Sequence, residues 1–182
     1  MKRAHMVGNG PSYKDFSKID ETDFVVGCNL PHVPADLTFI CDIRFLNTIH
    51  DKKITLPCPA MVSAKIQTTI DKNKHKYNGK LNVKGVMKKR QPIAPSSLSS
   101  GHHAVLWLID NGYEEIHIWG CDGLVTKSME SKTDDYVTVS VKGNRKHCER
   151  HTEKWKKSWQ HIVKTNGKVK FIFHNFSGGK IP

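Results

Sequence analysis

Short apolar runs that stop abruptly at polar turns constrain the fold of this chain most strongly. Three such runs open the sequence: Ala4–Val7, Phe24–Cys28 and Leu37–Cys41. The first ends in Gly8-Asn9-Gly10-Pro11-Ser12, the second at Asn29 and the third at Asp42. Runs of this length between turn residues are typical of buried strands in a parallel sheet. Because ligands bind beyond the carboxyl ends of such strands, we expect the polar residues after these runs to lie along one ligand-binding crevice.

The second half of the chain alternates helical patterns with further apolar runs. Apolar spacing predicts helices over His102–Asn111 and Cys148–Lys164, and apolar runs predict strands at Glu115–Trp119 and Lys170–Phe173. Strands that alternate with helices over 182 residues indicate an α/β fold. We therefore predict a single Rossmann-like domain over residues 1–182, with a mostly parallel sheet flanked by helices.

Two segments have no clear period. Gly79–Gln91 is basic and punctuated by glycine, and we expect it to be a mobile surface loop within a basic stretch at about 72–92. The polar segment at about 124–146 contains one alternating run, Tyr136–Val141, which fits either a short strand or a lid on the acceptor side.

The charge of the chain is strongly positive and unevenly distributed. The formal net charge is +12, from 29 basic and 17 acidic residues, and the segments Lys72–Arg90 and Lys142–Lys157 carry much of the excess. A basic surface can serve solubility alone, but this concentration favours a polyanionic partner, with nucleic acid as the first candidate. The candidate phosphate contacts are Lys84, Lys88, Lys89, Arg90, Arg145 and Lys146.

The cysteines and the amino terminus indicate where the chain functions. Five scattered cysteines without a C-x-x-C pair predict free, mostly buried thiols and neither a disulfide framework nor a zinc ribbon. No apolar run approaches the roughly 18 residues of a membrane span, and Met1–Met6 has no signal-peptide character. We expect a soluble cytoplasmic protein without membrane association, in the host cytoplasm if phage-encoded. The sequence does not indicate an oligomeric state.

Two turns are suited to a phosphate group. The Gly8–Ser12 loop follows a strand, and its small residues let the backbone approach a ligand closely. Ser99-Ser100-Gly101 precedes a helix, where hydroxyls, free amides and the helix dipole favour an anion. Glycine turns alone are common, but two anion-receptive turns in one small domain predict a nucleotide ligand.

The ordered motifs resemble those of the bacterial lipooligosaccharide sialyltransferases. That family opens with a strand that runs into a Gly-Asn-Gly-Pro-Ser loop, which Gly8–Ser12 reproduces. Cys28-Asn29 is similar to the family's second-strand Cys-Asn, and Ser99–Gly101 is similar to its Thr-Ser-Gly turn. Further matches are Gly112–Ile116 and Gly120–Asp122, so the resemblance covers the ends of the nucleotide-binding core but not its middle.

This resemblance implies a glycosyltransferase that uses a cytidine-monophosphate sugar and requires no metal or other cofactor. The implied donor contacts are Gly8, Asn9, Gly10, Ser12, Asn29, Ser99, Ser100, Gly101 and Gly120. The family's general base falls at His147 or His151, and a neutral histidine can take a proton from an acceptor hydroxyl. Asp42 and Asp122 are alternative candidates for sugar hydroxyls or for the base, and turn capping accounts for them equally well.

Departures from the family pattern leave the donor and the acceptor open. Ser97 replaces a family arginine, and Gly123–Val125 lacks the family's phosphate-binding tyrosines, so a UDP-linked sugar is an alternative donor. The missing charge could come from Lys127, Lys88, Lys89, Arg90 or Arg145. The first acceptor candidate is a hydroxymethylated pyrimidine in DNA, as in phage DNA modification. The alternatives are an anionic glycan acceptor, or a nucleotide- or nucleic-acid-binding protein without catalysis.

Overall fold

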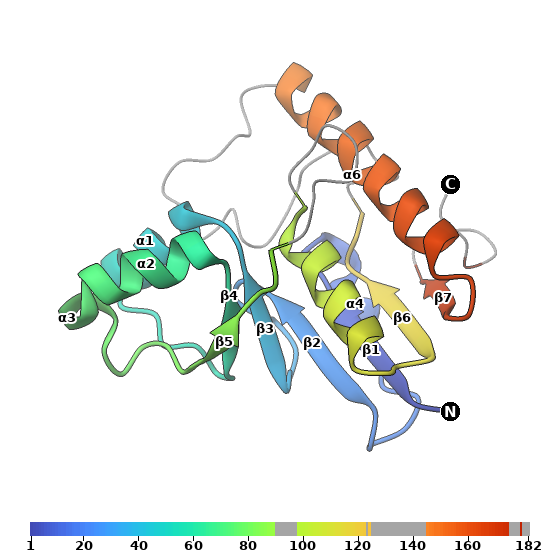
Figure 1. Ribbon diagram of the computed structural model, residues 1–182, viewed down its shortest axis with the longest axis horizontal. Coiled ribbons are helices and arrows are strands. Elements are labelled where there is room, and N and C mark those ends of the chain that lie inside the picture. The colour runs from blue at the N-terminus through green and yellow to red at the C-terminus, as the bar shows by residue number, and fades with distance from the viewer. Residues whose placement is uncertain (90–97, 123, 125–144, 175–178, 180–182) are drawn as a thin grey trace.

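The computed structural model describes residues 1–89, 98–122, 124, 145–174 and 179, and for residues 145–151 it describes the backbone only. Within these ranges seven strands form one parallel sheet in the order β5-β4-β3-β2-β1-β6-β7 (Figure 1). The strands are β1 (Arg3–Val7), β2 (Phe24–Cys28), β3 (Leu37–Ile40), β4 (Ala60–Val62), β5 (Val83–Val86), β6 (Glu115–Trp119) and β7 (Lys170–Phe173). The predicted Rossmann-like α/β fold is confirmed.

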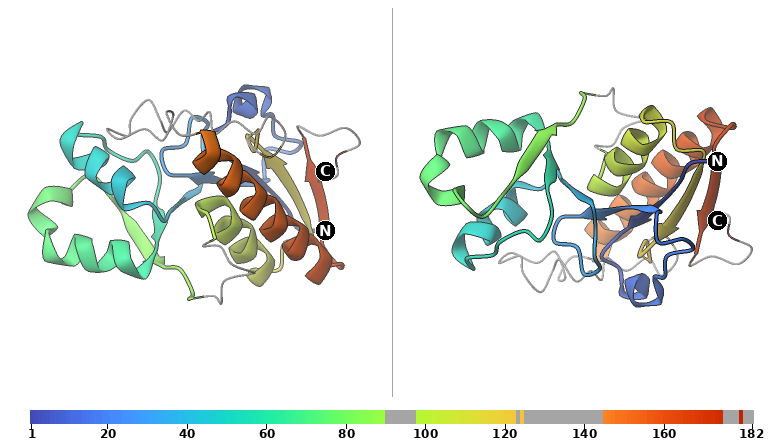
Figure 2. Two further views of the ribbon diagram at one scale, coloured as in Figure 1. Left: turned by 90° about the horizontal axis from the view of Figure 1, so that it is seen from above. Right: turned by 90° about the horizontal axis from the view of Figure 1, so that it is seen from below.

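Helices cover both faces of this sheet (Figure 2). They are η1 (Pro11–Asp15), α1 (Ile43–Asp51), α2 (Ala64–Lys72), α3 (Lys74–Tyr77), α4 (Ser100–Asp110) and α6 (Arg145–Thr165). From β1 to β5 the chain advances toward one edge, and right-handed crossovers place η1, α1, α2 and α3 on one face. The connections from β5 to β6 through α4 and from β6 to β7 through α6 lead toward the opposite edge of the sheet. These helices therefore cover the opposite face (Figure 2).

Alternating side chains of the strands supply a separate core on each face. Met6 and Phe39 pack with Trp159 and other side chains of α4 and α6 on one face. Ile40 packs with the helices from α1 to α3 in a second cluster, and Val7 packs with Trp119 beneath η1 in a third. The predicted helices and the apolar face of α6 are confirmed, because Trp159 and Ile162 are buried.

The expectation of a loop over Gly79–Gln91 was wrong in part, because this segment contains β5. Val83 and Val86 flank Lys84 and Gly85 on the edge strand, and Val86 is 45% exposed. Lysine on an exposed edge discourages pairing with other chains. In the sequence, the same lysine makes the short strand look like part of a basic loop. The run Tyr136–Val141 lies outside the described residues.

The prediction of free thiols is confirmed for the four cysteines whose side chains the structure describes. Cys28 and Cys58 are buried, and Cys41 and Cys121 are half-buried. Burial raises the pKa of Cys41 to about 11 and that of Cys121 to about 12, so both stay protonated and unreactive near neutral pH. Within the described ranges, no helix has the length and apolar character needed to cross a membrane.

A close contact between two glycine turns joins the carboxyl ends of β1 and β6. The Gly8 amide donates to Trp119 O and the Gly10 amide to Gly120 O, both at 2.9 Å. A Cβ on Gly8 would lie 2.5 Å from Gly120 O, and a Cβ on Gly10 would collide with the Asp122 carboxylate. Gly120 has a φ of +64°, in the left-handed region that favours glycine. These glycines therefore let two turns pack backbone to backbone.

We predict that Gly120→Ala destabilises the protein by about 3 kcal/mol or more, because the new methyl group would strike Gly8 O and occupy a left-handed backbone. Gly112→Ala is the matched control, since Gly112 has a φ of +76° but open space around it. Its expected cost is about 1 kcal/mol. Urea unfolding measures both, and equal losses for the two variants would contradict the importance of the contact.

Candidate active site

The topology places a ligand site at the carboxyl ends of β1 and β6. The chain leaves β1 through η1 on one face and leaves β6 toward α6 on the other, so these neighbouring strands form the switch point of the sheet. In open α/β sheets, ligands bind outside the carboxyl ends at such a point. The turns at Gly8–Ser12 and Gly120–Asp122 meet there.

Asn9 and Asn29 lie together at this edge. Asn9 is buried, and its Nδ2 donates to Cys28 O at 2.7 Å, which holds the side chain against the end of β2. Asn29 follows directly with a φ of 55°, a left-handed conformation that asparagine tolerates better than most residues. The backbone amide of Asn29 donates to Phe39 O at 3.0 Å, and Thr38 Oγ1 donates to the backbone carbonyl oxygen of Asn29 at 2.9 Å.

The side chain of Asn29 carries an unsatisfied acceptor. Its Oδ1 is buried and has no hydrogen-bond partner in the described part of the chain. Buried polar atoms are normally paired, so an orphaned oxygen beside a switch point indicates a place for a ligand N–H or O–H. Both asparagines thus occupy the edge that the sequence predicted for them.

The start of α4 lies beside the same strand ends. The Cys41 amide donates to Ser100 Oγ at 3.3 Å, which fixes the helix terminus next to β3. Gly101 packs against Met6 and Trp159, where an added Cβ would have ordinary contacts at 3.4 and 3.5 Å. The first amides of a helix have no acceptor within the helix and carry partial positive charge, so this terminus can receive an anion.

A buried histidine holds this helix terminus, and the sequence reasoning missed it. His102 is completely buried and forms a reciprocal capping box with Ser99. Burial lowers the pKa of His102 to about 3, so the ring is neutral at pH 7. The only sequence signal was its place three residues after a serine at a helix start, where glutamate or glutamine is the usual partner.

Both candidate aspartates accept hydrogen bonds at turns, Asp42 within its own turn and Asp122 across to the Gly8–Ser12 turn. Asp42 Oδ1 accepts from the Arg44 amide at 2.9 Å at the start of α1, and the same carboxylate forms an ion pair with the Arg44 guanidinium at 2.6 Å. Asp122 Oδ2 accepts from the amide and the hydroxyl of Ser12 at 3.1 and 2.8 Å. Asp122 and Ser12 therefore fasten the two glycine turns together, and the capping role anticipated for these aspartates is the one the geometry shows.

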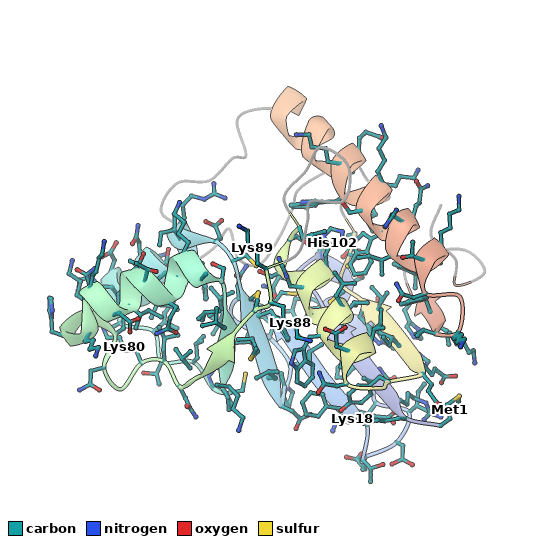
Figure 3. The ribbon with its side chains drawn as sticks, viewed as in Figure 1. Met1, Lys18, Lys80, Lys88, Lys89 and His102 are labelled. Carbon is teal, nitrogen blue, oxygen red and sulfur yellow. The ribbon has the colours of Figure 1, made fainter. Side chains whose placement is uncertain are left out.

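The basic candidates lie in different parts of the molecule. Lys84 is exposed on β5, and Lys88 forms an ion pair with Asp110 at 3.4 Å. Figure 3 shows Lys88 and Lys89 on the segment that leaves β5, apart from Lys80 at the other end of that strand. The structure does not describe Arg90 or Lys127, nor the side chains of Arg145, Lys146, His147 and His151. The base and all six phosphate contacts therefore stay predictions.

A layer of aromatic and charged side chains beneath the Gly120 turn was also missed. His174 stacks on Trp119 with ring centroids 3.4 Å apart and an interplanar angle of 4°, and His174 Nε2 lies 2.7 Å from His117 Nδ1. The Trp119 indole N–H donates to His5 Nδ1 at 3.2 Å. Hydrogen bonds from His117 and Lys170 lower the pKa of Glu115 to about 2. This network orients the last residue before Gly120.

Known structures share this fold. No protein-family model and no curated protein sequence matches the chain. A variant of the sialyltransferase CST-II solved with CMP is 19% identical with a TM-score of 0.57, over 95% of this chain and 81% of that one. CST-II with a trisaccharide acceptor and CMP is 17% identical with a TM-score of 0.54, over 94% and 80%. CstII from Campylobacter jejuni with CMP-3FNeuAc is 17% identical with a TM-score of 0.50, over 95% and 80%.

The chain has the fold of the sialyltransferase CST-II. The resemblance read from short motifs thus extends, in three dimensions, over nearly the whole chain, including the middle that the motifs did not cover. Within the described residues, no group of three or more histidine, cysteine or acidic side chains could hold a metal ion.

We predict that the free energy of unfolding falls as the pH drops from about 6.5 toward 3. The unfolded chain takes up a proton at His102 in this window, whereas the folded chain, with its lowered pKa, does not. His102→Gln should make the slope shallower by about 1.4 kcal/mol per pH unit. Denaturant unfolding at several pH values tests this, with the exposed His75→Gln as control. An unchanged slope in His102→Gln would contradict the assignment.

Proposed function

We propose that this protein is a glycosyltransferase that moves a sugar from a CMP-linked donor to a hydroxyl acceptor. The observation that carries the proposal is the buried, unpartnered Oδ1 of Asn29 at the switch point, beside Asn9. The fold shared with CST-II, which has been solved with CMP and with CMP-3FNeuAc, supports a CMP-linked donor over a UDP-linked one.

The parts of this site suit the transfer reaction. The acceptor oxygen attacks the anomeric carbon, the bond from that carbon to the phosphate oxygen breaks, and CMP leaves with the bonding electron pair. The amide groups at the start of α4 can stabilise the charge that develops on the leaving phosphate. The acceptor proton passes to a general base, for which the sequence resemblance implies His147 or His151.

We expect Asn9→Ala and Ser100→Ala to weaken CMP binding at least tenfold, because each change removes a polar group that holds the ligand edge together. Asn82→Ala, on an exposed position before β5, is the control and should bind like the wild type. Calorimetry with CMP measures all four proteins. Equal affinity for wild type, Asn9→Ala and Ser100→Ala would place the nucleotide elsewhere.

We expect turnover to need no divalent metal, because the sequence lacks an Asp-x-Asp motif of the kind that holds Mg²⁺ or Mn²⁺ at a sugar diphosphate. Release of nucleotide from a panel of CMP- and UDP-linked sugars should be the same with and without chelator. Activity that chelator abolishes and Mn²⁺ restores would favour a diphosphate-sugar donor.

The net charge of +12 supports a polyanionic acceptor, and two kinds remain as proposals. CST-II has been solved with a trisaccharide acceptor, which favours a glycan. DNA with hydroxymethylated pyrimidines is the second candidate, because the charge is so high. The sheet order separates the lysines near β5 from those on α6, beside β7, and Lys88 pairs with Asp110 at the end of α4 that lies away from the ligand edge.

A salt series distinguishes these acceptors. If DNA binds through about four phosphates, log affinity should fall with log salt at a slope of roughly −3 to −4. A Lys88, Lys89 and Arg90 triple alanine variant should give a flatter slope. Weak, salt-independent DNA binding by both proteins would eliminate DNA and leave an anionic glycan.

A further inference from the structure

A chain of hydrogen bonds runs from a buried carboxylate to the surface beneath the Gly120 turn. His117 Nε2 lies 3.0 Å from Glu115 Oε1, and His117 Nδ1 lies 2.7 Å from His174 Nε2. Glu115 and His117 are buried in β6, whereas His174 is exposed directly after β7, which lies at one edge of the sheet (Figure 1). The chain therefore connects the interior of this layer with solvent.

The position of each hydrogen in this chain follows from its first member. Hydrogen bonds from His117 and Lys170 lower the pKa of Glu115 to about 2, so the carboxylate is ionised and can only accept. His117 Nε2 must therefore carry a proton. In a neutral His117 the opposite nitrogen, Nδ1, has a lone pair, and His174 Nε2 donates to it.

One further proton fits this chain, and two do not. A proton that binds to His174 from solvent still leaves a single hydrogen between the two rings, and that hydrogen can pass from one ring to the other. A second proton would place hydrogens on both facing nitrogens, which are 2.7 Å apart. Burial and the nearby rings of His117 and His5 lower the pKa of His174 to about 4, in agreement with this limit. The two rings therefore titrate as a pair.

His5 does not compete for this proton. The Trp119 indole N–H donates to His5 Nδ1, so a neutral His5 carries its hydrogen at Nε2, which lies 3.0 Å from Asp23 Oδ2. Burial lowers the pKa of His5, which keeps the ring neutral near pH 7. Among the described residues, the charged side chains around the layer come from β1, the turn before β2, β6 and β7: Arg3, Asp23, Glu115 and Lys170. Two are cations and two are anions, so a proton on the pair is an excess positive charge.

Trp119 receives this excess charge on its ring face. His174 stacks on Trp119 with ring centroids 3.4 Å apart and an interplanar angle of 4°. A protonated imidazole is attracted to the negative face of an indole ring. The Trp119 carbonyl also accepts from the Gly8 amide at 2.9 Å. The residue that the protonated pair holds is thus the one that joins the two glycine turns.

We propose that His174 is a positioning residue that, by sharing one proton with His117, holds Trp119 and the Gly120 turn against Gly8. The pair makes the ligand edge sensitive to pH. One bound proton tightens the contact between the turns, and a second drives His174 off Trp119 and loosens it. This inference goes beyond the proposed function, because it concerns the junction of the turns whatever ligand binds there.

Nuclear magnetic resonance from about pH 8 to about pH 3.5 tests the proposal through the histidine side-chain nitrogens and the exchange protection of the Gly8 amide. In the wild type, the facing nitrogens of His117 and His174 should shift together when the first proton binds. Protection of the Gly8 amide should rise in the same step by about two- to fivefold. The second step, at about pH 4, should reverse this gain. Separate titration of the two rings would overturn the inference.

Two variants separate the proton from the packing. His174→Phe keeps a flat ring for Trp119 but cannot bind a proton, and His174→Gln can donate to His117 but does not titrate. Both should lack the two steps at the Gly8 amide, while His75→Phe, at an exposed position, should follow the wild type. If His174 only packs against Trp119, the Gly8 amide of folded His174→Phe would respond to pH as in the wild type. That result would overturn the inference.

CMP affinity provides a second readout, which rests on the proposed function. The ratio of wild-type to His174→Phe affinity should rise by about two- to fivefold as the pair takes up its first proton. An unchanged ratio in proteins that bind CMP would overturn the coupling to the ligand edge. A wild type that binds no CMP would overturn the proposed function, and the Gly8 amide would then decide this inference alone.

Discussion

The backbone contact between Gly8 and Gly120 is the constraint on which the rest of the site depends. The first amide after β1 donates to the last carbonyl of β6, and the next exchange, from Gly10 to Gly120, extends the pairing past the end of the sheet. Side chains at these positions would hold the turns apart. The contact lies at the switch point, so the close packing that completes the fold also fixes the edge at which a ligand is expected.

Polar contacts extend from this junction in both directions. Asp122 clamps Ser12 across the two turns, and Asn9 reaches from the first turn to the end of β2. The next link runs from Cys41 at the end of β3 to Ser100 at the start of α4, and His102 joins that helix to α6. Each of these links has a backbone group as one partner or belongs to a helix cap. The ligand edge is therefore held without long flexible side chains.

The sequence was informative wherever local chemistry decides structure. Strands that stop at Asn29 and Asp42, and a helix that starts after Ser99, could be predicted because turn and cap residues act on their own neighbours. Neither β5 nor α1 could be predicted in this way. β5 is an edge strand with an exposed lysine, and the N-cap of α1 is Asp42, a residue equally suited to binding a ligand and to capping a helix.

The site residues show the same difference between what local sequence determines and what distant partners determine. The positions of Asn9 and Asn29 follow from strand order, but the role of Gly8 and Gly10 depends on a turn more than a hundred residues away, which no local pattern reveals. The importance of His102 depends on a carbonyl of α6, and that of His174 on a tryptophan of β6. Such long-range partners become visible only in the folded chain.

The central claim is that the edge formed by Gly8–Ser12, Asn29 and Ser99–Gly101 binds a cytidine nucleotide. Titration of the isotopically labelled protein with CMP, followed by amide and side-chain chemical shifts, tests it most directly. The largest shifts should fall on these residues, with the Asn29 side-chain amide among them, and the amides of α2 and α3 should not shift. Shifts confined to residues outside this edge, or none at millimolar CMP, would contradict it.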